Sequence, residues 1–258
     1  MRSLVLAASD SLVLARRNLL RIPRQPDLLI GFTLQPVMFV VLFVYVFGGA
    51  IQTPGFDDYA DFLMPGIIVQ TMSFGGFVTA LGLADDLGKG LIDRFRSLPM
   101  ARSAVLVGRT VADVATNTIS LLIMIGVGLV VGFSFGTGAL EIVAGFVLML
   151  LFGFAFSWIF ALIGMSVSSG ESANAVGFTV IFPLTFLSSA FVPIETFPAV
   201  LEAFAEVNPF TITTDAMRAL WLGAPAGNNV WGALAWSIGL TVVFAPLAVR
   251  RYRRAVAS

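Results

Sequence analysis

Few residues in this sequence have the types and spacing that could support chemistry. The densest group is Asp57, Asp58 and Asp61, three carboxylates that could hold a metal ion on the outer face of a membrane enzyme. The chain contains no histidine and no cysteine, which excludes the commonest zinc ligands, disulfides and thiolate catalysis. Carboxylates alone are weak support for an enzyme, so we expect no catalytic residue and no metal site.

A glycine-containing segment has a superficial likeness to a nucleotide site. In a phosphate-binding loop, two glycines stand about five residues apart, and the second is followed by Lys and then by Ser or Thr. Here Gly82 and Gly88 are six residues apart, and Gly90 follows Lys89 at the position that needs a hydroxyl. The sequence therefore predicts no ATP site, and any uphill transport must draw its energy from another polypeptide.

Asp113 is an acidic residue inside a long apolar segment, about one turn after Arg109 on the same helical face. This spacing favours an ion pair, and a role in gating is the alternative. Ion-coupled transporters usually keep carboxylates near the membrane midplane, and potassium channels carry a carbonyl-rich filter. The sequence shows neither pattern. An ion-coupled secondary transporter stays open as an alternative, which transport without ATP would support.

The elements that position these residues are predicted from a very apolar composition. The 258 residues are 58% hydrophobic and 12% charged, against about 25% charged in soluble domains. The apolar stretches run from end to end, which favours one all-α polytopic membrane domain over residues 1–258. Six of them approach the roughly 20 residues that a membrane-crossing helix needs, at about 28–50, 62–84, 105–132, 140–167, 172–193 and 229–249.

Residues 1–27, before the first span, predict an interfacial helix. Over residues 3–24, Leu4, Leu12 and Leu19 fall on one helical face, and several arginines fall on the opposite face. A basic amphipathic helix of this kind is suited to lie in the membrane interface. The alternative is a solvated helix on the cytoplasmic side.

The links between the spans differ in their content of basic residues. Five basic residues precede the first span, five lie in the link after the second span, and four lie in the tail, which makes 14 of the 15. The link after the first span has no basic residue, and the link after the fifth has only Arg218. Because cytoplasmic loops are rich in Lys and Arg, six spans place both termini in the cytoplasm.

The outer link at 194–223 is unusually apolar. Its first half predicts a short helix that Asn208 and Pro209 end, and residues 213–222 predict a second helix closed by Gly223. Two short apolar helices predict a re-entrant hairpin, which needs protein around its backbone. A small extracellular cap is the alternative.

The link after the second span predicts a short cytoplasmic helix over about 85–98. Leu87, Leu91, Phe95 and Leu98 form an apolar stripe at helical spacing. An apolar helix face that enters a groove is a common mode of docking. The alternative is that this helix lies on the lipid surface, and the stripe alone does not separate the two.

Residues 86–102, which read DLGKGLIDRFRSLPMAR, and the following Gly108-Arg109 resemble the cytoplasmic link of type-2 ATP-binding-cassette (ABC) exporter permeases. The likeness is greatest to daunorubicin/doxorubicin-resistance permeases. The outer link resembles the same family in its FVP run at 191–193, its NPFT run at 208–211 and its AMRAL run at 216–220. The resemblance covers essentially the whole chain, in the order interfacial helix, two spans, coupling helix, three spans, re-entrant hairpin and last span.

This resemblance implies a permease subunit in the plasma membrane that pairs with a second permease chain, identical or related. It also implies two copies of a separate ABC ATPase subunit, which would bind ATP and magnesium, whereas this chain would bind no cofactor and no nucleic acid. The coupling helix over about 85–98 would dock the ATPase. The residues of this chain that correspond to the coupling surface are Leu87, Leu91, Asp93, Arg94, Phe95 and Leu98.

By the same resemblance, the substrate path lies at the dimer interface and is lined by spans one, two and five. The corresponding residues are Gln35, Phe39, Gln70, Phe74, Phe178, Phe182 and Phe186, and ordinary packing or lipid-facing roles are the alternative. A phenylalanine-rich path with few charges suits the export of a hydrophobic or amphipathic compound, such as a drug or a lipid. Export of a polysaccharide or glycolipid is the alternative within the family.

Overall fold

The computed structural model describes residues 26–51, 53, 55, 56, 58–88 and 104–255, and all regular elements among them are helical. In chain order they are α2 (Pro26–Leu42), the π-helical turn η2 (Phe43–Phe47), α3 (Tyr59–Ser73), the 3₁₀ turn η3 (Phe74–Gly76), α4 (Phe77–Gly88), α6 (Ala104–Val130), α7 (Ala139–Gly164), α8 (Gly170–Phe186), the 3₁₀ turn η4 (Ile194–Thr196), α9 (Ala199–Val207), α10 (Pro209–Leu222) and α11 (Asn229–Ala255).

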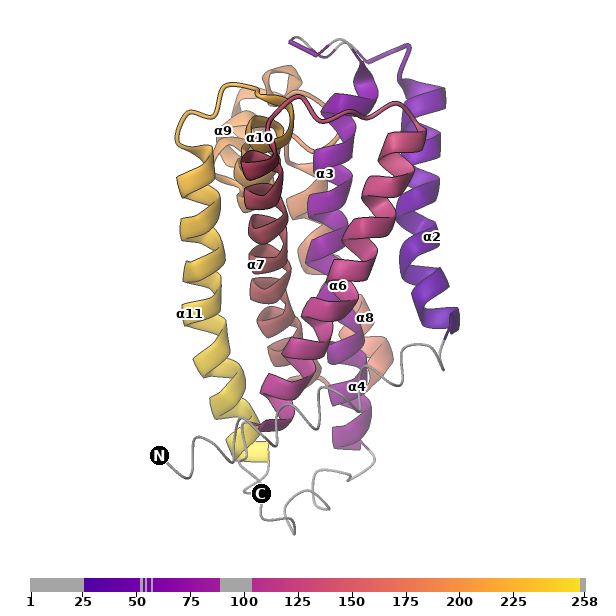
Figure 1. The fold of residues 1–258 in the computed structure, drawn as a ribbon. Helices are drawn as coiled ribbons and strands as arrows, with labels where there is room; N and C mark the ends of the chain where they lie inside the picture. Colours follow the sequence, from indigo (N-terminus) through magenta and orange to yellow (C-terminus); the bar gives the residue numbers. More distant parts are fainter. Residues whose placement is uncertain (1–25, 52, 54, 57, 89–103, 256–258) are drawn as a thin grey trace.

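The long helices stand side by side in one bundle (Figure 1). The short helices α9 and α10 lie together at one end, which we call the hairpin end. The start of α2 and the ends of α4 and α11 lie at the opposite end, which we call the terminal end. The predicted interfacial helix over 1–27 lies almost wholly outside the described residues.

Four helical stretches among the described residues are long and apolar enough to cross a membrane. They are Tyr59–Ala84, Gly108–Val130, Ala139–Gly164 and Asn229–Arg254. They correspond to the predicted second, third, fourth and sixth spans, with borders moved by up to five residues. The predicted first span corresponds to α2 with η2, and the predicted fifth span corresponds to the shorter α8. The all-α membrane fold is therefore confirmed.

The second predicted span is not one continuous helix. It is interrupted at η3, and α4 then continues to Gly88, past the predicted border at residue 84. The Ser73 hydroxyl donates to the Gln70 carbonyl at 2.6 Å just before the break. A β-carbon at Gly76 would lie 2.6 Å from the Ser157 Cα in α7. The tight turn thus lies where α7 packs closely against the backbone of the second span.

The predicted fifth span, 172–193, is too long. Helix α8 ends at Phe186, one turn after Pro183. The Asn208 side chain of the hairpin donates to the Leu184 and Leu187 carbonyls, both at 2.7 Å, and so satisfies groups that a helix end leaves unpaired. A cap supplied from 21 and 24 residues away in the sequence could not be predicted from helical periodicity.

The same asparagine begins the second hairpin helix. Its Oδ1 accepts a hydrogen bond from the Phe210 amide at 2.9 Å, and Pro209 occupies the first turn of α10. The helix therefore starts four residues earlier than the predicted 213–222, as N-cap and proline preferences allow. Gly223 closes α10 with φ of 76°, as predicted for a left-handed C-cap.

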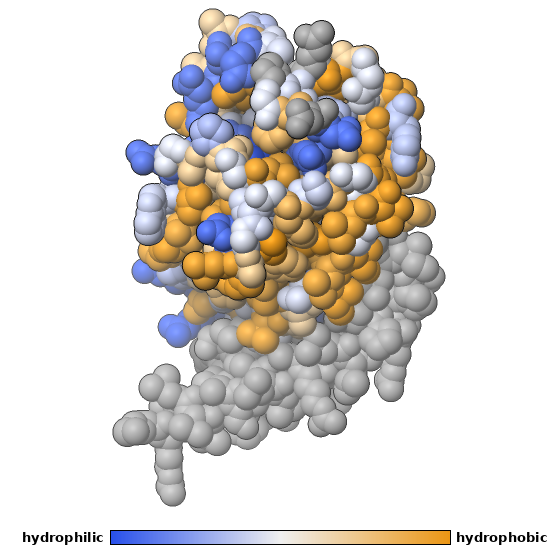
Figure 2. All heavy atoms as spheres, turned by 45° about the horizontal axis from the view of Figure 1, so that its top comes forward, coloured by the Kyte–Doolittle hydropathy of each residue, from blue (hydrophilic) through white to orange (hydrophobic). Residues whose placement is uncertain are grey.

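Much of the surface of the bundle is apolar. Figure 2 shows hydrophobic residues over much of the visible flank and hydrophilic residues mainly towards the hairpin end. On helix α11, for example, the exposed residues include Trp231, Ile238, Val242 and Val243. Exposed apolar area on this scale is unusual for a soluble monomer, and it matches a bundle whose flanks are surrounded by lipid.

Candidate functional site

A connected series of phenylalanine rings begins where α4 meets α8. Phe178 of α8 lies 5.3 Å from Phe74 of η3 and 5.9 Å from Phe77 of α4, measured between ring centroids. Phe77 in turn contacts Phe160 of α7 at 5.5 Å. These separations are typical of favourable aromatic pairs, so this end of the series is anchored in the core of the bundle.

The series then follows one face of α8. Phe178, Phe182 and Phe186 are spaced four residues apart, which places them one above another on a helix. Adjacent rings lie 5.9 Å and 4.9 Å apart. Phe182 and Phe186 remain 42% and 39% exposed, so their rings are also available to another apolar molecule.

Beyond α8 the rings continue to α2. Phe186 stacks on Phe191 at 5.2 Å, and Phe191 stacks on Phe43 at 4.9 Å. Phe39 lies 6.0 Å from Phe43 and 6.4 Å from Phe191. We call the connected set Phe39, Phe43, Phe74, Phe178, Phe182, Phe186 and Phe191 the phenylalanine series.

Five of the seven residues predicted for the substrate path belong to this series. The other two do not extend it, because Gln35 lies exposed on α2 and Gln70 is buried within α3. Sequence reasoning did not assign Phe43 and Phe191 to the path. The signals were present: Phe39, Phe43 and Phe47 repeat every four residues, and Phe191 opens the FVP run.

Arg218 of α10 forms the densest polar site at the hairpin end. Its Nε and Nη2 donate to the Phe62 carbonyl of α3 at 3.1 and 2.8 Å, and Nη2 also donates to the Ser189 carbonyl at 2.7 Å. Its Nη1 donates to Asp215 Oδ1 at 2.7 Å and to the Ser189 hydroxyl at 3.1 Å. The guanidinium carbon lies 3.6 Å from the centroid of the Phe62 ring.

The site joins three parts of the chain, namely α3, the segment after α8 and α10. Burial lowers the pKa of Arg218 to about 10, and the nearby Asp215 carboxylate opposes this shift. The guanidinium therefore stays charged at neutral pH. In the sequence, Arg218 stood out only as the single basic residue of an acidic link, three residues after Asp215.

A second buried polar site lies between α4, α6 and α7. Asp113 Oδ1 of α6 accepts a hydrogen bond from the Thr79 hydroxyl of α4 at 2.9 Å. Arg109 Nη1 lies 3.5 Å from the Thr79 carbonyl. Both members of the predicted Arg109–Asp113 pair thus contact the same α4 residue. These two contacts fasten α6 to α4.

One turn further along α6, the Asn117 side chain lies against Gly75 of η3 and Gly153 of α7. A β-carbon at Gly153 would lie 2.7 Å from Asn117 Nδ2. The Asn117 amide is buried. Small residues on two neighbouring helices thus make room for a polar side chain inside the bundle.

The acidic residues of the first link form no metal site in the described part of the chain. Asp61 Oδ1 accepts a hydrogen bond from the Ser134 amide at 3.1 Å, and Asp58 is exposed. Asp57 lies outside the described residues, and so does most of the predicted coupling helix, from residue 89 onwards. Leu87 is described only as part of the backbone of α4.

The chain shares its sequence pattern with membrane transporters. The sequence profile of a family described as "ABC-2 type transporter" matches residues 10–222. The daunorubicin resistance ABC transporter permease protein DrrB1 of Streptomyces coeruleorubidus is 35% identical over 247 residues, which cover 96% of this chain and 87% of that protein.

Two further relatives are more distant. The probable doxorubicin resistance ABC transporter permease protein DrrC of Mycobacterium tuberculosis (strain H37Rv) is 26% identical over 97% of this chain and 90% of its own length. The probable multidrug ABC transporter permease YbhR of Escherichia coli (strain K12) is 24% identical over 77% of this chain and 54% of its own length. The all-helical bundle, its apolar flanks and these matches together show that the chain belongs to the ABC-2 type transporter family, as a permease.

Proposed function

We propose that this permease is the membrane subunit of an ATP-driven exporter that moves a hydrophobic or amphipathic compound, such as a drug, out of the cell. The observation that carries the proposal is the phenylalanine series, in which every member is apolar and the rings of Phe182 and Phe186 are exposed on α8. The names of the relatives support it, because they are described as resistance or multidrug permeases.

The proposed topology has six spans with both termini in the cytoplasm. Helices α2 and α8 would cross the membrane with the four longer spans, because both lie alongside them in the bundle (Figure 1). The hairpin end would then face outwards. Basic residues support this orientation, since Arg250, Arg251, Arg253 and Arg254 all lie at the terminal end of α11.

The proposed assembly contains two copies of this chain, or this chain and a related one, and two copies of a separate ABC ATPase subunit. The ATPase would bind ATP and magnesium, and the helix over about 85–98 would dock it through Leu87, Leu91, Asp93, Arg94, Phe95 and Leu98. Helix α4 supports this role, because it runs without interruption from η3 into that link. A movement of the ATPase would therefore be transmitted directly to the inner half of the second span.

The proposed substrate path follows the phenylalanine series, and Gln35 of α2 and Gln70 of α3 are its further candidate residues. Phe182 is the most informative residue to substitute, because its ring is exposed. Among the described residues, it stacks only with neighbours of its own helix. Removing one aromatic contact costs about 1 kcal/mol, which is a roughly five-fold loss of affinity.

The experiment compares Phe182→Ala with Phe154→Ala in proteoliposomes that contain the full complex. Phe154 is a matched control, because it packs on Trp158 in a separate apolar cluster with α11. We expect Phe182→Ala to raise the concentration of exported compound needed for half-maximal transport about five-fold, with basal ATP hydrolysis unchanged. Equal effects of the two substitutions would refute the proposed path.

A further inference from the structure

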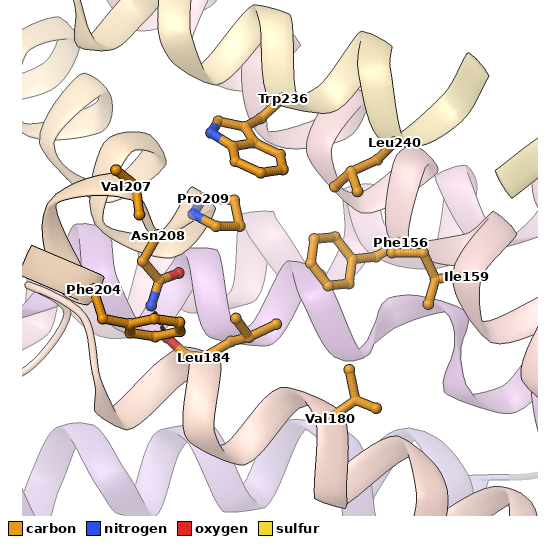
Figure 3. A pocket seen from close by; sticks show the side chains of 10 residues that line it. All are labelled: Phe156, Ile159, Val180, Leu184, Phe204, Val207, Asn208, Pro209, Trp236 and Leu240. Atoms are coloured by element: carbon orange, nitrogen blue, oxygen red, sulfur yellow. Dashed lines mark hydrogen bonds between the residues drawn. The ribbon is translucent and has the colours of Figure 1, made fainter. Parts of the chain in front are cut away.

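An apolar groove lies on the side of the bundle formed by α7, α8 and α11. Its volume is about 300 Å³, and α9 and the start of α10 close it at the hairpin end. Figure 3 shows side chains from these five helices around a central gap. The residues that line it are Phe156, Ile159, Val180, Leu184, Phe204, Val207, Asn208, Pro209, Trp236 and Leu240.

The groove offers a ligand nothing but hydrocarbon contacts from its deep side. Asn208 is its one polar residue apart from the indole of Trp236, and the amide of Asn208 is already engaged. Its nitrogen donates to the Leu184 and Leu187 carbonyls, and its oxygen accepts from the Phe210 amide. A polar or charged group would lose its hydration here without gaining a partner. The occupant must therefore present an apolar segment to the groove.

The mouth of the groove is continuous with the surface that faces lipid. Val180, Phe204, Val207 and Trp236 line the groove and are also exposed on the outside of the bundle. Trp236 belongs to α11, the candidate span with the smallest buried share. Because this protein is embedded in a bilayer, molecules that reach this mouth come from the hydrocarbon layer.

Helix α9 places the groove near one surface of the membrane. Its apolar residues Val200, Phe204 and Val207 are exposed, and Glu202 and Glu206 lie on the same short helix. Short helices with separate apolar and charged residues lie in the membrane interface. The groove therefore begins just below the interface at the hairpin end, at the depth of the upper acyl chains of that leaflet.

We propose that this groove is a lipid-binding site that holds one acyl chain of a phospholipid from the leaflet at the hairpin end. A volume of about 300 Å³ is at the lower limit for ligand pockets, so it accommodates part of one chain and leaves the headgroup at α9. The chain fills the gap between α8 and α11 and supports α9. The site is separate from the phenylalanine series, and the proposal requires only that the protein lies in a membrane.

The test uses phosphatidylethanolamine with a photoactivatable diazirine on one acyl chain, added to the full-length protein in nanodiscs. After illumination, the labelled peptides are mapped by mass spectrometry. We expect label on the groove-lining residues of α8, α9 and α11, saturating with added probe and displaced by excess unlabelled phosphatidylethanolamine.

Val180→Phe fills the groove from its exposed side and should reduce this label several-fold. Val242→Phe is the matched control, because Val242 is 65% exposed on α11 and does not line the groove. In this variant, the labelling of the groove should be the same as in the unaltered protein. If Val180→Phe does not yield folded protein, Leu240→Phe fills the same space from α11.

Label spread evenly over the exposed flanks, or label that neither groove-filling variant reduces, would overturn the lipid site. Labelling is measured without the ATPase and without a transported compound. Its outcome is therefore independent of the export experiment, and either proposal can fail while the other stands.

Discussion

Arg218 shows how a single charged residue can organise the hairpin end of a membrane protein. Its hydrogen bonds reach the Asp215 carboxylate and the Ser189 hydroxyl, and also two carbonyls from distant parts of the chain, those of Phe62 and Ser189. Breaking a buried charge network by removing one partner usually costs more than the net value of the interaction. This side chain therefore contributes strongly to the contact between α10 and the start of α3.

We predict that Arg218→Ala destabilises the folded protein by about 3–5 kcal/mol, because it removes the donor shared by two carbonyls and the cation that pairs with Asp215. Arg218→Lys should restore little of the lost stability, since an ammonium group cannot reproduce the planar fork of a guanidinium. Thermal unfolding in detergent measures both. Arg250→Ala is the control, because Arg250 is exposed on α11. A melting temperature of Arg218→Lys equal to wild type would contradict the geometry.

The Asp113–Thr79 contact makes a second residue-level prediction. Asp113→Ala removes the acceptor of a buried hydroxyl and should cost about 1–3 kcal/mol, whereas Asp113→Asn keeps an acceptor oxygen and should cost less. A double-mutant cycle with Thr79→Val measures the coupling between the two side chains. Coupling indistinguishable from zero would mean that the hydrogen bond does not fasten α6 to α4.

At the scale of helices, glycines allow the closest contacts in the bundle. Gly66 faces the backbone of Ala190, Gly76 faces Ser157, and Gly164 faces the backbone of Ala80. In a membrane, where lipid competes for apolar surface, close packing of small residues drives helix association. The second span therefore has close glycine contacts above, at and below its break; the first is with the segment after α8, and the other two are with α7.

We predict that Gly76→Ala destabilises the protein by about 1–3 kcal/mol, the usual cost of overpacking. The reason is that the new methyl group would meet the α7 backbone, which cannot rotate away. Gly126→Ala is the matched control, because Gly126 lies in α6 with no atom within 4 Å of an added β-carbon. There, alanine should be neutral or slightly stabilising. Equal melting temperatures for the two variants would show that the helix contact is looser than the structure indicates.

The helices themselves were largely predictable, and their ends were not. Apolar length and charge asymmetry located each predicted span on a helix. They gave no warning that α8 stops at Phe186, because its cap comes from Asn208 across the fold. The break at η3 was equally hidden, although two consecutive glycines, Gly75 and Gly76, stand at its position in the sequence.

The same contrast holds for the sites. The phenylalanines of α8 were predicted through the resemblance of the sequence to the permease family. Arg218 was missed as a site, since its partners are backbone carbonyls that any sequence supplies. Interactions with the backbone leave no mark on residue types, so only the structure could bring α3, Ser189 and α10 together.

At the scale of the whole molecule, the bundle has two chemically different ends. Polar contacts fasten α10 to α3 at the hairpin end, whereas α4 leads into the basic link at the terminal end. If force enters through that link, it would reach the inner half of the second span, which is tied to α6 through Thr79 and Asp113, before the outer half, which is tied to α10.

The most direct test is affinity purification of this chain in mild detergent from its native host, with identification of copurifying polypeptides. The account predicts a soluble chain with a phosphate-binding loop in stoichiometric amount, lost in the variant Leu91→Asp/Phe95→Asp and retained in Ser97→Asp on the polar side of the same predicted helix. Recovery of this chain alone, even after crosslinking through residues 85–98, would contradict an ATP-driven mechanism and favour a self-contained transporter.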